Sequence, residues 1–191
     1  MRTGAQTWSK SLIFVRFLLA ACLALSAGCA EHTIVDEVWQ DRDRVNVGLG
    51  KTLVLALFPD DNIGILLEDE WSQQLGNHGI GADAMNTLLP DERPPSRQRI
   101  LEVVQARGLD TVLVSQLVAV KQVDRNVSAY QVVVTKVTLY DTKTEQPIWW
   151  VQADTYLVSA TSDRQVNIPR KEEIREYVET MIKEMSKRGM L

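Results

Sequence analysis

The sequence predicts a single α/β domain in which a mixed five-stranded sheet carries helices on both faces. Two continuous apolar runs, at residues 52–58 and 111–120, are typical of strands buried on both faces. Residues 130–140 and 148–158 have the pattern of half-buried strands joined by a polar turn. Near the C-terminus a third feature predicts a long amphipathic helix, because one apolar stripe recurs at helical spacing: Ile174, Tyr177, Val178, Met181, Ile182 and Met185.

The remaining elements lie between these runs. After the first strand, Leu67, Trp71 and Leu75 follow at four-residue spacing and predict a helix. Residues 80–89 predict a short strand, and Ser96 is a suitable N-cap for a second helix that Gly108 ends. The order is therefore β-α-β-α-β-β-β-α. Right-handed crossovers then predict the sheet order 2-1-3-4-5, counted along the chain, with the first two helices on opposite faces.

The N-terminal leader predicts export from the cytoplasm. Residues 1–28 hold a positive start, an apolar run at 17–25 and small residues before Cys29, as in a secretory signal peptide. The uncharged run is shorter than the ~20 apolar residues that a membrane helix needs. The residues before Cys29 resemble a bacterial lipobox, which implies that Cys29 is acylated, for example with palmitate, and becomes the mature N-terminus. Acylation of Cys22, ordinary cleavage and no cleavage are the alternatives.

Resemblance also implies a location. Ala30, rather than the Asp of inner-membrane retention, follows Cys29, so the lipoprotein pattern implies the periplasmic face of the outer membrane. Acyl chains would then hold the protein to the membrane. We expect three segments: a signal peptide at 1–28, a lipidated tether at 29–46 and a periplasmic α/β domain at 47–191.

Charge and composition exclude several functions. The chain has 191 residues and a net charge of −4, and its leader contributes bases but no acids. We therefore expect no nucleic-acid binding, because phosphate contacts need clustered Lys and Arg. The two cysteines both lie in the leader, and only two histidines occur. Thiolate chemistry in the domain is excluded, and we expect no metal site, no cofactor and no catalysis.

One motif partly matches the sequence of a nucleotide-binding P-loop. Gly50, Lys51 and Thr52 spell the end of a P-loop, but Val45 stands where the first glycine is required. A P-loop also joins a strand to a following helix, whereas these residues precede their strand. We interpret them as a turn that leads into the strand, and Lys51 as a residue without a phosphate.

The best candidate for a binding surface is the aromatic pair in the last strand. Neighbouring strand residues face opposite ways, so one of Trp149 and Trp150 should enter the core. If Trp150 is exposed, Ile148 and Tyr156 share its face and form a patch for a partner. The alternative is that helices cover both faces. Our candidate partner-binding residues are Trp149, Trp150 and Tyr156.

Several ordered motifs resemble a family of uncharacterised proteobacterial envelope lipoproteins. The resemblance covers nearly the whole mature chain and rests on these positions: Trp39 and Asp41, residues 52–58, residues 68–79, Gly108 with Asp110 and residues 111–114, Leu139 to Thr144 followed by Trp149, and the end at 189–191. The element order is similar to the periplasmic domain of the curli-secretion channel lipoprotein and to the small domain before the Tol propeller. Those are assembly modules, and the family has no known site residues to carry over.

We therefore expect a non-catalytic, lipid-anchored periplasmic module that binds an envelope protein or associates with itself. The alternative is a carrier or sensor of a small apolar or lipid ligand, held in a pocket beside the sheet. A flat exposed patch with Trp149 or Trp150 would favour the first function, and a deep apolar pocket would favour the second.

Overall fold

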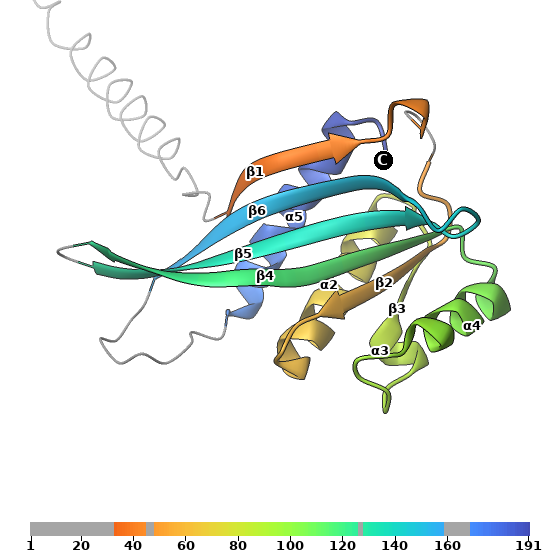
Figure 1. The fold of residues 1–191 in the computed structure, drawn as a ribbon, viewed down its shortest axis with the longest axis horizontal. Helices are drawn as coiled ribbons and strands as arrows, with labels where there is room; N and C mark the ends of the chain where they lie inside the picture. Colours follow the sequence, from red (N-terminus) through yellow and green to blue (C-terminus); the bar gives the residue numbers. More distant parts are fainter. Residues whose placement is uncertain (1–32, 45–47, 126–127, 159–168) are drawn as a thin grey trace, which may run out of the picture. The chain divides into compact units, whose positions relative to one another are not determined.

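The computed structural model describes residues 33–44, 48–125, 128–158 and 169–191, so the leader and Cys29 lie outside the described residues. Its helices and strands are shown in Figure 1. They are, in chain order, β1 (Thr33–Gln40), a 3₁₀ turn η1 (Arg42–Arg44), β2 (Thr52–Leu57), α2 (Asp61–Asn77), β3 (Ala82–Ala84), α3 (Met85–Leu88), α4 (Arg97–Arg107), β4 (Thr111–Arg125), β5 (Ser128–Asp141), β6 (Pro147–Val158) and α5 (Lys171–Lys187).

The strands form one mixed sheet, which confirms the α/β class. The order is β1-β6-β5-β4-β2-β3. β2 pairs in parallel with β3 and β4, whereas β4, β5, β6 and β1 pair antiparallel. The prediction of five strands was wrong. The predicted strands correspond to β3, β2, β4, β5 and β6, and the observed order differs by β1, which lies beside β6 within the segment expected to be a tether.

Two apolar cores lie on opposite faces of this sheet. Alternation in β2 sends Val54 toward α2 and Leu53 toward α4, and each belongs to a different cluster. α2 and α5 together cover one face across the width of the sheet (Figure 1). On the other face α3 and α4 cover only the end formed by β2, β3 and the start of β4. The rest of that second face has no helix among the described residues.

The C-terminal helix α5 packs as its pattern predicts. All six residues of the apolar stripe are buried against the sheet. They lie in the same cluster as Trp149, whose exposed fraction is 0%. Because an isolated helix of this length is marginal in water, burial of the stripe is what holds α5 in place.

A buried carboxylate joins α2 to the elements around it. Glu68 is fully buried, and its Oε1 accepts the backbone N–H of Ala56 at 2.9 Å while its Oε2 accepts that of Asn86 at 2.7 Å. Arg93 donates from Nη1 to Oε2 at 3.1 Å. The segment predicted as a strand at 80–89 therefore stops at Ala84. There the chain turns into α3 so that the N–H of Asn86 reaches this carboxylate.

The Gly-Lys-Thr motif is a turn that anchors the start of β2. Gly50 has a φ of +60°, and a Cβ there would lie 2.5 Å from the carboxylate of Asp110. That carboxylate accepts the backbone N–H of Lys51 at 2.9 Å. The hydroxyl of Thr52 lies 2.9 Å from that of Thr111 in the next strand. The motif serves strand pairing, with an acid in the place where a P-loop would hold phosphate.

Candidate functional site

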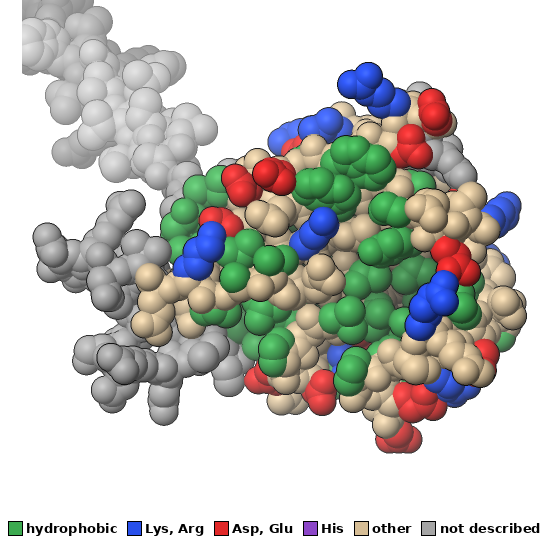
Figure 2. Space-filling model, viewed as in Figure 1, with side chains coloured by type: hydrophobic (Ala, Val, Ile, Leu, Met, Phe, Trp, Pro, Cys, Tyr) green, Lys and Arg blue, Asp and Glu red, His purple; other side chains and the backbone are tan. Residues whose placement is uncertain are grey.

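The candidate site is the part of the second sheet face that lies beyond α3 and α4, which we call the open face. It is built from β1, β6, β5 and the distal half of β4. Figure 2 looks onto this side and shows hydrophobic side chains spread over it among scattered charges. Its more exposed residues include Ile34, Asp36, Glu37, Trp39, Lys121, Lys136, Trp150, Gln152, Asp154 and Tyr156.

Strand alternation decides which aromatic residue reaches this face. Trp149 points to α5 and is fully buried, so it takes no part in the surface. Trp150 and Tyr156 point the other way, as the sequence allowed. Ile148, expected on the same face, is buried with an exposed fraction of 6%. Trp150 pairs directly across the strands with Trp39 of β1.

The open face exposes more apolar surface than the sequence indicated. The exposed fractions are 54% for Ile34, 40% for Trp39 and 37% for Tyr156. Ile34 and Trp39 were missed as site residues because residues 29–46 were assigned to a tether. Their signal was weak, because the apolar residues of 33–40 stand in two adjacent pairs, and a bulge between Val35 and Glu37 breaks the alternation expected of a strand.

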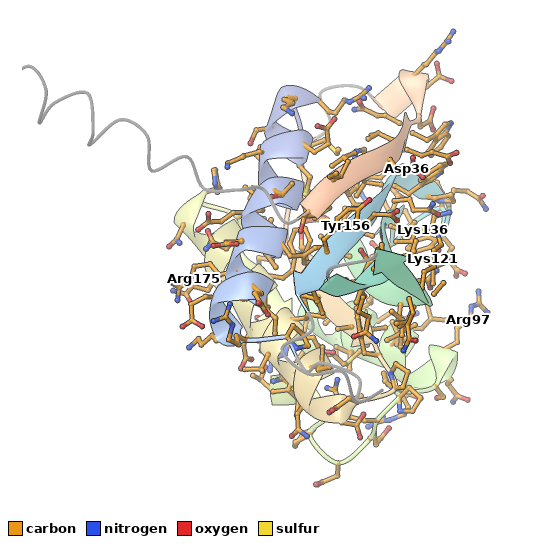
Figure 3. All side chains as sticks on the ribbon, turned by 90° about the vertical axis from the view of Figure 1, so that its left-hand side faces the viewer. Asp36, Arg97, Lys121, Lys136, Tyr156 and Arg175 are labelled. Carbon is orange, nitrogen blue, oxygen red and sulfur yellow. The ribbon has the colours of Figure 1, made fainter. Side chains whose placement is uncertain are left out.

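Charges on the open face are separated by sign. The acids Asp36 and Glu37 lie on β1 and Asp154 on β6, whereas Lys121 lies on β4 and Lys136 on β5. Figure 3 shows Asp36, Tyr156, Lys136, Lys121 and Arg97 on the sheet side, while Arg175 lies on the opposite side with α5. This separation makes one half of the open face acidic and the other half basic.

One of these charges is held by an aromatic ring. The Nζ of Lys136 lies 4.2 Å from the ring centroid of Trp150. A cation over the face of an indole is attracted by about 0.5–1 kcal/mol at an exposed site. The contact restrains both side chains, so Lys136 is held at the middle of the open face.

The described residues also form hollows away from the open face. A groove of about 260 Å³ separates α4 from the sheet, and the ion pair of Arg97 with Glu145 joins two of its lining residues. The groove is lined mostly by apolar side chains, among them Leu55, Ile100, Leu101, Val104, Val112, Val114 and Tyr140. On the other face, a cavity of about 50 Å³ lies between α5 and the sheet and reaches Tyr177.

Tyr177 is a titratable residue of the smaller cavity, which Glu173 also lines. Burial raises the pKa of its phenol, and the nearby hydroxyls of Thr135 and Ser115 oppose part of that rise. The phenol is therefore neutral at physiological pH and adds no charge to a cavity lined mainly by Phe58, Ile63, Leu67, Val133, Leu157 and Ile174.

The described residues contain no group of three or more His, Cys, Asp or Glu side chains that could hold a metal ion. Within the same residues no helix is long and apolar enough to cross a membrane. Cys29, the expected lipid attachment site, lies outside this part of the chain, so its acylation stays a prediction.

Comparison with known proteins gives a fold but no family. No family model matches the chain, and no curated protein matches it. A dodecamer of PelC from Paraburkholderia phytofirmans is 13% identical with a TM-score of 0.50, over 83% of this chain and 97% of that one. The lipoprotein GNA1162 from Neisseria meningitidis is 15% identical with a TM-score of 0.49, over 72% of this chain and 99% of that one. At such identity the PelC likeness extends to the fold alone. The similarity to the curli and Tol domains stays a prediction.

Proposed function

We propose that the chain is a non-catalytic binding module of the bacterial envelope. N-terminal acyl chains on Cys29 hold it at the periplasmic face of the outer membrane, and its open face binds an envelope protein. The lipobox-like residues before Cys29 support the anchor.

The observation that carries this proposal is the row of exposed apolar side chains on a sheet face that no helix of the described residues covers. Ile34, Trp39 and Tyr156 are each more than a third exposed. Clustered exposed apolar residues mark interaction sites, and Trp and Tyr are enriched where partners bind most tightly. The charged side chains beside them supply the polar rim that protein interfaces have.

Two further observations favour binding over catalysis. The Gly-Lys-Thr turn uses its Lys51 N–H to bind the carboxylate of Asp110, which would repel a phosphate. In addition, PelC, which has a similar fold, is a dodecamer. An assembly role is therefore compatible with this arrangement of strands and helices.

The test is loss of partner recovery. Trp39→Ser combined with Tyr156→Ser should abolish recovery of the partner that co-purifies with the full chain after cross-linking in cells. Lys183→Ser, on the exposed side of α5, is the matched control and should recover it normally. Both variants should melt near the wild-type temperature. Equal recovery with the double variant and with wild type would contradict the proposal.

A carrier of a small apolar ligand is the second candidate, and the groove beside α4 favours it. Its volume of about 260 Å³ is near the lower end of ligand pockets, and its walls are mostly apolar. A long-chain fatty acid should then raise the melting temperature of wild type, and Ile100→Trp should remove that shift by filling the groove. No shift with wild type at millimolar fatty acid would exclude this candidate.

A further inference from the structure

We propose that the open face binds a second copy of this chain, through a two-fold axis that runs along the strands between β5 and β6. This inference rests on the proposed function, because it names the partner of the same surface. Three features of the open face carry it: the arrangement of its charges, its relief and the register of its strands.

The charge arrangement is self-complementary. Asp36 and Glu37 on β1 and Asp154 on β6 make one half acidic, while Lys136 on β5 and Lys121 on β4 make the other half basic. A two-fold interface brings the same patch of both copies together, so the patch must complement itself. A rotation about an axis along the strands places the acidic half of one copy over the basic half of the other.

The exposure of apolar side chains also differs between the two halves of the open face. Apolar side chains of β1 and β6 protrude from the open face, among them Ile34 and Tyr156, with exposed fractions of 54% and 37%. On β4, Val118 at the bulge of the strand is 50% exposed. On β5, Val132 and Val134 face the same side but are only 3% and 2% exposed. The same rotation therefore places protruding side chains of one copy over recessed positions of the other.

The strand register decides which charges meet. Glu37 pairs with Gln152 on β6, and Gln152 pairs with Lys136 on β5, so the three lie in one row across the sheet. After the rotation, Lys136 of the second copy lies over Gln152 and beside Glu37. An axis across the strands would instead place β1 over β1 and bring acids against acids, which opposes association.

Lys136 is already ordered for this contact, since its ammonium group is held 4.2 Å from the ring centroid of Trp150. A side chain that is restrained before binding loses less conformational entropy when the complex forms. Each two-fold interface would contain this arrangement twice, with Trp150, Lys136 and the Glu37 of the other copy in sequence.

The first arm of the test maps the contact. The full chain is purified in mild detergent from cells grown on ¹⁴N medium and, separately, on ¹⁵N medium. The two preparations are mixed and allowed to exchange subunits. A carbodiimide then joins carboxylates to amines that are in contact. We expect mixed-isotope peptides that link Glu37 to Lys136. Links at this pair that contain one isotope only would overturn the inference, because they arise within one chain.

The second arm tests the charges by reversal. Glu37→Lys and Lys136→Glu should each lower the yield of dimer, measured by light scattering of the full chain without cross-linker, at least about tenfold, because a two-fold interface contains each change twice and sets like charges against each other. The combination of both should return the yield to within a few-fold of wild type. Lys183→Glu on α5 gives the same change of charge on the opposite side and should leave the yield unchanged. A double variant as weak as the single variants would overturn the inference.

These arms separate the inference from the function on which it rests. If no dimer forms but an envelope protein still co-purifies and is lost with Trp39→Ser and Tyr156→Ser, the second-copy inference fails and the binding module stands. If neither a dimer nor a partner is found, both fail. A dimer that forms at unchanged yield in every charge variant places the contact elsewhere and also overturns the inference.

Discussion

Glu68→Gln tests how strongly the buried carboxylate holds the domain together. The substitution keeps the shape of the side chain but removes its charge and turns one oxygen into an N–H donor. In the fold that donor meets either the N–H of Ala56 or the N–H of Asn86, which both point at the carboxylate from 2.9 and 2.7 Å. Arg93, only 11% exposed, also loses the nearer of its two carboxylate partners and keeps Asp61 at 3.6 Å.

Breaking a buried ion pair on one side costs about 3–5 kcal/mol. A domain of this size unfolds with about 5–15 kcal/mol, so the substitution removes a large share of its stability. At roughly 2–4 °C per kcal/mol for a chain of this length, the melting temperature should fall by roughly 6–20 °C.

Circular dichroism of the chain without residues 1–28 measures this fall. Asp69→Asn is the matched control, because Asp69 is the next residue of α2, is exposed and undergoes the same kind of change. It should shift the melting temperature by no more than a few degrees. Equal melting temperatures for Glu68→Gln and the control would refute the view that this carboxylate holds α2, β2 and α3 together.

Three further predictions follow from packing, titration and anchoring. Ile182→Ala, at a side chain only 4% exposed, should lower the free energy of unfolding by about 2–5 kcal/mol in thermal melts, whereas Lys183→Ala should lower it little. Similar melting temperatures for the two variants would contradict the packing of α5 in the core. Because burial raises the pKa of Tyr177, its neutral phenol stabilises the fold below pH ~10 and that stability is lost as pH rises further. Tyr177→Phe should make urea midpoints fall less steeply above pH ~10, where the phenol of the unfolded chain ionises before that of the fold, and an unchanged slope would contradict the assignment. Cys29→Ser should abolish incorporation of radioactive palmitate. Labelling that persists until Cys22 is also changed would show that Cys22 is the acylated residue.

The sequence predicted elements well where one period dominates a long segment. The apolar stripe of α5 is such a case, because only a helix places its six apolar side chains on one face, where they can be buried together. β1 was missed because its period is broken. Val35 and Val38 both pack toward the helices although they are three residues apart, since the bulge between Val35 and Glu37 shifts the alternation.

The sequence predicted only part of the candidate site, because strand alternation is a local signal and the position of the covering helix is not. Alternation shows that Trp149 and Trp150 face opposite ways, but the choice of buried residue depends on which face α5 covers. That is a tertiary fact with no local signal.

The hairpin between β5 and β6 gives a second example. Glu145 has a φ of +56°, a conformation that the sequence gives no reason to expect of a glutamate. Its N–H donates to the carbonyl of Asp141 at 2.8 Å, so the hairpin closes tightly.

The most direct measurement for the open face is photo-cross-linking in intact cells. A benzophenone amino acid is placed at Tyr156 in the full-length, membrane-anchored chain, and at Lys183 on the opposite side as control. After irradiation, we expect a discrete adduct from position 156, identified by mass spectrometry as an envelope protein or a second copy, and none from position 183. Adducts from position 183 alone, or none from position 156 in cells that produce the protein, would contradict the claim that the open face is where this protein binds.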